Sequence, residues 1–443
     1  MTAPQRQASQ RPFGRRPAPR TRAVSGTRAW PAGRTPPAVR PAPDRPPGPG
    51  SPAAPAAADL AVTVCRDPER FAALAQDWTA LHRRCPSATA FQSHAWLHSW
   101  WLSYGTPGRL RVVLVHQGGE LIAAAALTLI YRPLPALVPL GGDISDFCDV
   151  LLDDSCAPQA AVALVRGMRK AARGSVVDLR EVRPGAAAEQ VYARWRGPRR
   201  RLPDSACLEL PGVPVEGLVA RLSGRAARTF RAKLRKLDKL SIEERAVPPA
   251  EVPAAVAALL RLHGLQWRGR GVTPEHLRPR FAEHLARAAT GMVRAGDARL
   301  IEYRVEGRVM ALDLTLLSAD LAGGYLSGAH PELRSRKVDI TAMLLRHDAR
   351  YVSETGRGAL SMLRGTEPYK RHLRPVTVTN QRLLLARPVG LPVLLAQVAH
   401  AAARSAAAEL VRTRLPAVRR WRSRLNSRRA DAAGARRACR AGA

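Results

Sequence analysis

Three neighbouring stretches of the sequence decide the fold: 324–328 (GYLSG), 330–337 (HPELRSRK) and 359–370 (ALSMLRGTEPYK). The first predicts a short strand, the second a polar turn, and a helix headed by Asp339 follows the turn. Free N–H groups and the positive end of the dipole meet at the start of such a helix and can bind an anion. Three basic residues of the turn add positive charge there, namely Arg334, Arg336 and Lys337.

The third stretch predicts a strand at 359–363 that ends in the segment 364–370 (RGTEPYK). Open α/β sheets bind ligands at the carboxyl ends of their strands. A segment that combines both charge signs with glycine, proline and an aromatic residue at this place therefore predicts a ligand site. A structural role stays open, in which Glu367 pairs with Arg364 or Lys370.

An internal repeat underlies the chain. Residues 111–130 (RVVLVHQGGELIAAAALTLI) and 299–317 (RLIEYRVEGRVMALDLTLL) each predict a β-hairpin with a tight glycine turn. Each hairpin follows a helical stretch with aromatic residues and precedes a further strand and a helix. This order indicates a duplicated α/β unit. We expect its two halves at residues 59–205 and 206–386.

A basic segment lies at each end of the chain. Residues 1–58 hold ten Arg and fourteen Pro against one acidic residue, so we expect disorder, because they cannot bury enough apolar surface. Residues 387–443 hold thirteen Arg, and their apolar run at 389–410 is interrupted before it reaches the ~20 residues of a membrane span. We expect a basic helical tail there, which either lies on an anionic membrane surface or packs on the protein.

The formal net charge of +36 does not by itself indicate a nucleic-acid-binding protein. The two tails hold 23 Arg against three acidic residues, so 20 of the excess charges lie outside the two halves. The segment 223–240 also carries many basic residues, but its spacing predicts an amphipathic helix, with one apolar face and basic residues around the rest. That face holds Phe230, Leu234, Leu237 and Leu240. The charged side of this helix can meet phosphate groups or simply face solvent.

The order of hairpin, strand, turn, helix, strand and RGxEPYK resembles the GNAT acyltransferase superfamily, and within it the branch of CelD-like or BioF2-like acetyltransferases. The resemblance is good over 300–385 and fainter over the first half, where 146–154 (DFCDVLLDD) also looks like that branch. It implies an α/β fold of two tandem GNAT-like mixed-sheet halves, flanked by the disordered first tail and the basic helical second tail.

The resemblance also implies a co-substrate, an acetyl or longer acyl coenzyme A, held between the diverging strands 324–327 and 359–363. Its pyrophosphate is expected on the loop and helix start at 333–341. The chain departs from the branch at 339–341, which reads Asp-Ile-Thr where Ser-Pro-Gly is usual. The expected coenzyme A-binding residues are Leu326, Ser327, Gly328, Arg334, Arg336, Lys337, Val338 and Thr341.

The expected chemistry is N-acylation by direct attack of an amine on the thioester, with a backbone N–H of 325–328 polarising the carbonyl. The amine must first lose a proton. Glu367 is our first candidate base for its place in the motif, followed by Asp313, whose charge is costly inside an apolar strand. Tyr325 or Tyr369 can protonate the departing thiolate. Arg364 and Lys370 are the expected substrate-binding residues.

No metal site is expected, because the six cysteines form no CxxC pair, and they suit a reducing cytoplasm. The acceptor is expected to be an amine on a small molecule or on a polysaccharide or lipid precursor, with peripheral membrane contact through the second tail. Two alternatives stay open. One is a Fem-like transferase of envelope biosynthesis that takes its acyl group from aminoacyl-tRNA, which would make tRNA a partner. The other is a binding module that has lost catalysis.

Overall fold

The computed structural model describes residues 60–131, 134–268 and 273–414. The first tail (residues 1–58), residue 59 and the Arg-rich end of the second tail, from residue 415, lie outside the described residues. Their expected disorder and membrane contact therefore stay predictions. Within the described ranges, no helix combines the length and the apolar character that a membrane crossing requires.

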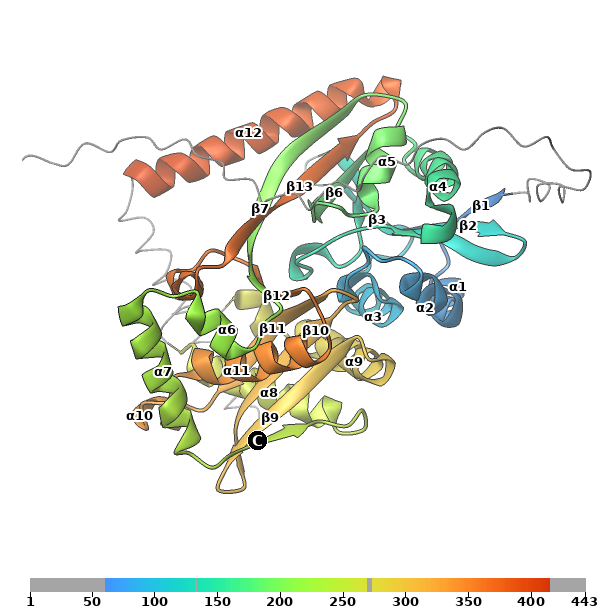
Figure 1. Cartoon of the computed structure of the whole chain (residues 1–443). Coiled ribbons are helices and arrows are strands. Elements are labelled where there is room, and N and C mark those ends of the chain that lie inside the picture. Colours follow the sequence, from blue (N-terminus) through green and yellow to red (C-terminus); the bar gives the residue numbers. More distant parts are fainter. Residues whose placement is uncertain (1–59, 132–133, 269–272, 415–443) are drawn as a thin grey trace, which may run out of the picture. The chain divides into compact units, whose positions relative to one another are not determined.

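The first half is an α/β unit of seven strands and five helices within the described residues (Figure 1). Its strands are β1 (Leu60–Cys65), β2 (Leu110–Gln117), β3 (Glu120–Tyr131), β4 (Pro135–Pro139), β5 (Leu151–Leu152), β6 (Val176–Val182) and β7 (Arg199–Pro211). Its helices are α1 (Pro68–Ala73), α2 (Ala75–Arg83), α3 (His94–Tyr104), α4 (Ala157–Ala171) and α5 (Ala188–Arg194).

The second half repeats this plan. Its strands are β8 (Ile242–Ala246), β9 (Ala298–Val305), β10 (Arg308–Leu317), β11 (Leu321–Ala329), β12 (Ala359–Arg364) and β13 (Val376–Leu385). Its helices are α6 (Val215–Ala220), α7 (Gly224–Asp238), α8 (Val252–Gln266), α9 (Pro279–Ala295), α10 (Pro331–Ser335) and α11 (Ile340–Glu354), and α12 (Leu391–Arg414) follows the last strand. Short 3₁₀ helices lie between them, including Pro368–Leu373.

The duplication predicted from the sequence is confirmed by the strand pairing. The hairpins β2–β3 and β9–β10 are both antiparallel, and each is extended by one more antiparallel strand, β4 or β11. In each half that strand then pairs in parallel with the strand beyond the next helix, β4 with β6 and β11 with β12. The fold is therefore α/β with two GNAT-like mixed-sheet halves, as expected.

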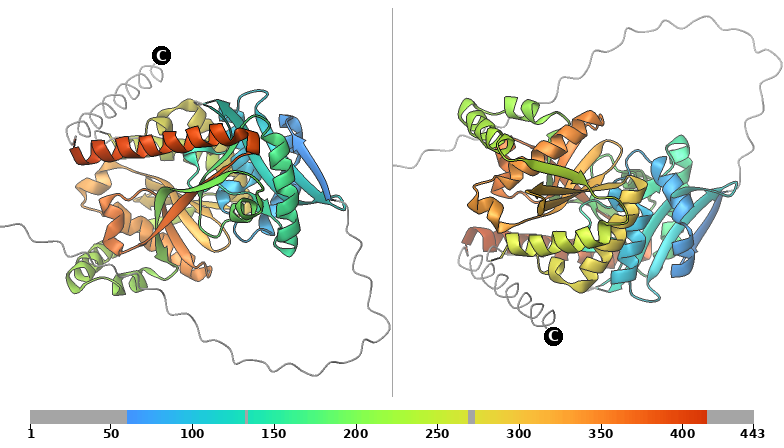
Figure 2. Two further views of the ribbon diagram at one scale, coloured as in Figure 1. Left: turned by 90° about the horizontal axis from the view of Figure 1, so that it is seen from above. Right: turned by 90° about the horizontal axis from the view of Figure 1, so that it is seen from below.

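The two halves exchange their last strands. β7 pairs with β12 of the second half, β13 pairs with β6 of the first half, and β7 and β13 pair with each other. The result is one continuous sheet in the order β1-β2-β3-β4-β6-β13-β7-β12-β11-β10-β9-β8, with β7 and β13 as the long central strands of Figures 1 and 2. The boundary expected between residues 205 and 206 lies within β7.

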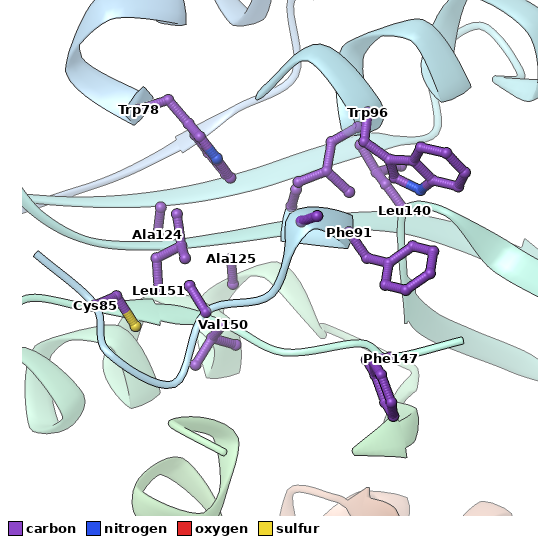
Figure 3. Packing of buried hydrophobic residues seen from close by; sticks show 14 of the residues in the cluster. Trp78, Cys85, Phe91, Trp96, Ala124, Ala125, Leu140, Phe147, Val150 and Leu151 are labelled. Carbon is purple, nitrogen blue, oxygen red and sulfur yellow. The ribbon is translucent and has the colours of Figure 1, made fainter. Parts of the chain in front are cut away.

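The core of the first half is aromatic where it approaches the second half. Phe91 lies between Trp96 and Phe147, with ring centroids 5.2 and 6.0 Å away in edge-to-face contacts (Figure 3). Trp96 also contacts His284 of α9 at 4.6 Å, which ties α3 to α9. The two halves thus share buried side chains as well as backbone pairing.

Helix termini follow the local sequence signals. Asp339 caps α11 by accepting a hydrogen bond from the Ala342 N–H at 2.9 Å, as a side-chain oxygen does at this position. α9 ends at Gly296, whose φ of 77° suits glycine. α7 buries Phe230 and Leu237 on the face expected from its apolar spacing.

The strand exchange predicts that the two halves unfold together. A calorimetric scan of the full chain should show a single transition, because neither half keeps its last strand without the other. A fragment of residues 212–414, which lacks β7, should not form a stable fold. Two well-separated transitions, or a folded fragment, would contradict this arrangement.

Candidate functional site

The parallel strands β11 and β12 separate shortly after they meet. They pair only from Leu321 to Gly323, opposite Ala359 to Ser361, and then diverge. A pocket of about 500 Å³ opens at the point of separation. It is lined by Gly324 and Ser327 of β11 and by Leu360, Ser361 and Met362 of β12, and Gln266 and Trp267 at the end of α8 also border it.

The start of α11 forms one end of this pocket. Ile340 and Thr341, in the first turn of the helix, line the pocket together with Val338 and Arg334. The first N–H groups of a helix have no partner inside the helix, so they can bind an anion. Asp339 is also part of the lining, but its carboxylate forms an ion pair with Lys233 of α7 at 2.6 Å. Its negative charge at this position is therefore compensated.

The segment before α11, α10 and the turn after it, carries two arginines that differ in their contacts. Arg334 is exposed and forms no ion pair among the described residues, so its charge is available to a ligand. Arg336 instead pairs with Glu332 at 2.6 Å and with Glu306 at 3.3 Å. Arg334 thus lines the pocket, whereas Arg336 is held by ion pairs at the protein surface.

A β-bulge lies on β11 where the pocket begins. Leu314 of β10 pairs with Leu326 and Thr315 pairs with Gly324, so Tyr325 is an extra residue without a partner on β10. The Tyr325 side chain is directed to the first half, where its hydroxyl donates to the Ile144 carbonyl at 3.0 Å. Its ring lies 5.2 Å from that of Trp96 and 5.9 Å from that of Phe91. Tyr325 is not among the pocket-lining residues.

Two buried carboxylates meet in the pocket, Asp313 of β10 and Asp348 of α11. The Thr315 hydroxyl lies 3.2 Å from Asp313 Oδ2 and 3.1 Å from Asp348 Oδ1 and bridges them. Burial raises the pKa of Asp313 to about 7. Burial, and next the charge of Asp313, raise the pKa of Asp348 well above its ordinary value. Near neutral pH the pair therefore retains a proton that an exposed aspartate would lose.

The RGTEPYK segment divides between the pocket and the contact of the two halves. Arg364 forms ion pairs with Asp146 and Glu181 of the first half, the latter at 3.2 Å. Lys370 is buried, lines the pocket and donates to the Arg364 carbonyl at 2.9 Å. Glu367 pairs with Lys370 at 3.0 Å, and its side chain is 49% exposed and not part of the pocket lining. The side chain of Tyr369 lies outside the described residues.

The structure gathers some of the predicted site residues and not others. Those that line the pocket are Asp313, Ser327, Arg334, Val338, Thr341 and Lys370. Those that do not line it are Tyr325, Leu326, Gly328, Arg336, Lys337, Arg364 and Glu367. Their roles in binding and catalysis stay predictions. Asp348 was missed, although one signal pointed to it: it interrupts the apolar stripe of Leu345 and Val352 on α11.

The first half is closed where the second is open. The segment that contains Phe147 and Cys148 runs between β6 and β3: the Cys148 N–H donates to the Glu181 carbonyl of β6 at 2.9 Å, and β5 pairs with β3. Beside the end of β4, a cavity of about 10 Å³ remains, which is roughly the size of one water molecule. The open pocket described above belongs to the second half.

Comparison with known proteins agrees with this geometry. Residues 224–371, which contain β11, α11 and β12, match the family model of the acetyltransferase (GNAT) domain. The matched residues lie within the second half. No group of three or more potential metal ligands lies together in the described residues of either half.

Among solved structures, FemX is similar in fold, with a TM-score of 0.52 over 72% of this chain and 98% of that chain, at 11% identity. A conserved protein of unknown function from Bacteroides thetaiotaomicron VPI-5482 has a TM-score of 0.49, covers 71% of this chain and 97% of its own, and is 14% identical. L-PGS from Bacillus licheniformis has a TM-score of 0.47, covers 76% of this chain and 97% of its own, and is 13% identical. No curated protein matches the sequence.

The raised pKa of Asp313 predicts a pH-dependent effect of its substitution. The folded protein holds a proton on Asp313 up to about pH 7, whereas the unfolded chain loses it near pH 4, so stability from this group falls as pH rises between these values. Asp313→Asn removes that loss. It should therefore increase the free energy of unfolding more at about pH 8 than at about pH 5, by on the order of 1 to 3 kcal/mol.

Chemical denaturation at the two pH values measures this difference. Asp154→Asn, at an exposed aspartate of the first half, is the matched control and should show the same small effect at both. If Asp313→Asn stabilises the protein no more at the higher pH than at the lower one, the pKa of Asp313 is not raised in the folded protein, and the prediction is wrong.

Proposed function

We propose that this protein is an N-acyltransferase that moves an acetyl or longer acyl group from coenzyme A to an amine. The observation that carries the proposal is the pocket between β11 and β12, which runs from the start of α11 to buried carboxylates within a domain that matches the GNAT model. A thioester donor needs a long cleft with an anion site at one end and a place for proton transfer at the other.

The mouth of the pocket suits the pyrophosphate of coenzyme A. The N–H groups of Ile340 and Thr341 and the guanidinium of Arg334 supply donors and positive charge. Asp339 replaces the residue that is usual in related sequences, and its carboxylate alone would repel a phosphate. Its ion pair with Lys233 offsets that repulsion and places a second cation beside the same helix start.

The bulged strand β11 suits the reacting thioester. Beyond Gly323 this strand no longer pairs with β12, so its edge faces the pocket. An N–H group on that edge can polarise the thioester carbonyl, which is the electrostatic help that the transition state needs. The remaining task is positioning, because a thioester is already activated.

Asp313 is the base that the geometry favours over Glu367. Asp313 lines the pocket next to Ser327, its partner in the β10–β11 ladder, and its pKa of about 7 suits proton transfer near neutral pH. Glu367 is half-exposed and bound to Lys370. In the proposed reaction, Asp313 takes one proton from the ammonium, and the nitrogen attacks the thioester carbon. As the carbon–sulfur bond breaks, a second proton moves from nitrogen to sulfur, and Asp313 releases its proton to solvent.

Arg334→Ala tests the proposed donor site. Loss of one cation at the pyrophosphate position should weaken binding of acetyl coenzyme A by roughly 10-fold, measured by calorimetric titration of the full chain. Arg173→Ala, at an exposed arginine of the first half, is the matched control and should leave the affinity unchanged. Absence of any coenzyme A thioester binding at millimolar concentration would remove this donor from the proposal.

Paired variants test the base. Asp313→Asn should lower kcat by roughly 10² to 10⁴ while the affinity for the acyl donor changes little, because an amide cannot accept the proton. Glu367→Gln should keep kcat within a few-fold of the unsubstituted protein. The opposite pattern, with a slow Glu367→Gln and a normal Asp313→Asn, would assign proton transfer to the RGTEPYK segment.

A second donor is supported by one specific observation, the basic face of α7. Lys233 of this helix forms an ion pair with Asp339 at the pocket mouth. Five further basic residues are exposed and form no ion pair among the described residues, namely Arg225, Arg228, Arg231 and Arg235 of the helix and Lys239 just after it. Such a surface could hold the phosphates of an aminoacyl-tRNA. Titration with aminoacyl-tRNA in parallel with acetyl coenzyme A separates the two donors, since only the nucleic acid should show a steep loss of affinity with salt.

A further inference from the structure

The inner end of the pocket holds two carboxylates that share a single hydrogen-bond donor. Asp313 is 3% exposed and Asp348 is 8% exposed. Among the described residues, each accepts one side-chain hydrogen bond, and in both cases the donor is the Thr315 hydroxyl. A hydroxyl carries one proton and can donate to one of them at a time. The other carboxylate is then left with no donor.

No cation of the described chain pairs with these carboxylates. The two basic residues that act on Asp348 form contacts elsewhere: His347, beside Asp348 on α11, binds Glu244 at 2.8 Å, and Arg299 lies over the ring of Tyr351 at 4.1 Å. Buried carboxylates are normally paired or hydrogen-bonded, because removing them from water is costly. The pair therefore lacks the positive group that would complete it.

A second, independent observation comes from Tyr303 of β9. Its side chain is fully buried, and its hydroxyl has no hydrogen-bond partner among the residues that the structure describes. Tyr303 pairs with Ala311 and Ile301 pairs with Asp313, so Tyr303 and Asp313 are diagonal neighbours on one face of the sheet. Burial, and next the charges of Asp313 and Asp348, raise the pKa of this hydroxyl. An unsatisfied buried polar group marks a place where the protein leaves room for a further polar partner.

The pair is open to the pocket. Asp313 and Asp348 both belong to its lining, together with Gly324 of β11. Gly324 has no side chain to cover Asp348, and a Cβ atom at that position would lie 3.9 Å from Asp348 Oδ2. A ligand group that enters along β11 can therefore reach both carboxylates.

We propose that Asp313 and Asp348 bind a primary ammonium group of the ligand that fills this pocket. An ammonium has three N–H donors and no acceptor, which suits a site with two carboxylates and a spare hydroxyl. The inference rests on the proposed function in taking this pocket as the transferase site, and it names the chemical class of the ligand. The ammonium belongs either to the acceptor or to the acyl group of the donor, as in an aminoacyl group.

Two pairs of test ligands of matched size separate charge from shape. The first pair is butylamine and 1-butanol, and the second is β-alanyl coenzyme A and butyryl coenzyme A. In calorimetric titrations of the full chain at about pH 8, we expect the amine-bearing member of at least one pair to bind about 10-fold or more tightly than its neutral counterpart. A preference in the first pair assigns the ammonium to the acceptor, and one in the second pair assigns it to the donor.

Substitution of Asp348 ties the preference to this site. Asp348→Asn should reduce the ratio of the two affinities to near one. Asp149→Asn, at a half-buried aspartate of the first half that lies outside the pocket, should leave it unchanged. If Asp348→Asn does not fold, as judged by its melting curve, Asp313→Asn serves the same purpose.

Equal affinities within both pairs, or a preference that persists in the substituted proteins, would overturn the inference. The test is distinct from that of the coenzyme A donor. If no thioester binds at all, the proposed donor fails, while butylamine and 1-butanol still decide whether the pair holds an ammonium.

Discussion

The short parallel ladder between β11 and β12 is the constraint on which the site depends. Only three residues of each strand pair, and everything that follows requires the strands to part. They can part without opening the fold, because each is held on its outer side by another strand, β10 beside β11 and β7 beside β12. Arg364 adds a side-chain anchor at the end of β12, through its ion pairs with Asp146 and Glu181 of the first half. The gap is thus a stable feature of the sheet.

The two halves share one plan, but the gap between the diverging strands is filled in the first half and open in the second. In the first half, the chain after β4 passes between β6 and β3 and places Phe147 in the core (Figure 3). In the second half, the chain after β11 turns directly into α10 and α11, and the gap stays open. The first half contributes instead to the shared interior, where the Ile144 carbonyl accepts a hydrogen bond from the Tyr325 hydroxyl and the ring of Trp96 packs against the ring of Tyr325. One half therefore supports the pocket of the other.

Local sequence patterns predicted the elements better than the contacts between them. The hairpins, the cap at Asp339 and the buried face of α7 could be predicted, because each depends on residues close in sequence. The exchange of β7 and β13 could not, because strand pairing over such separations leaves no local pattern. The same limit explains the site. Asp313 was found as a charge in an apolar strand, but its partner Asp348 and the spare hydroxyl of Tyr303 become neighbours only in the folded sheet.

The charges along the pocket give a ligand a direction. Arg334 and the start of α11 make the mouth positive, because Lys233 offsets the charge of Asp339, while Asp313 and Asp348 make the inner end negative. A ligand with a phosphate at one end and an ammonium at the other, or two ligands that meet end to end, would therefore enter in one orientation only. A coenzyme A thioester with a neutral acyl chain places its phosphates at the positive mouth, but it brings no cation to Asp313 and Asp348. The donor complex would then be electrostatically incomplete until an amine arrives, so binding of the acceptor should be strengthened by the same pair that removes its proton.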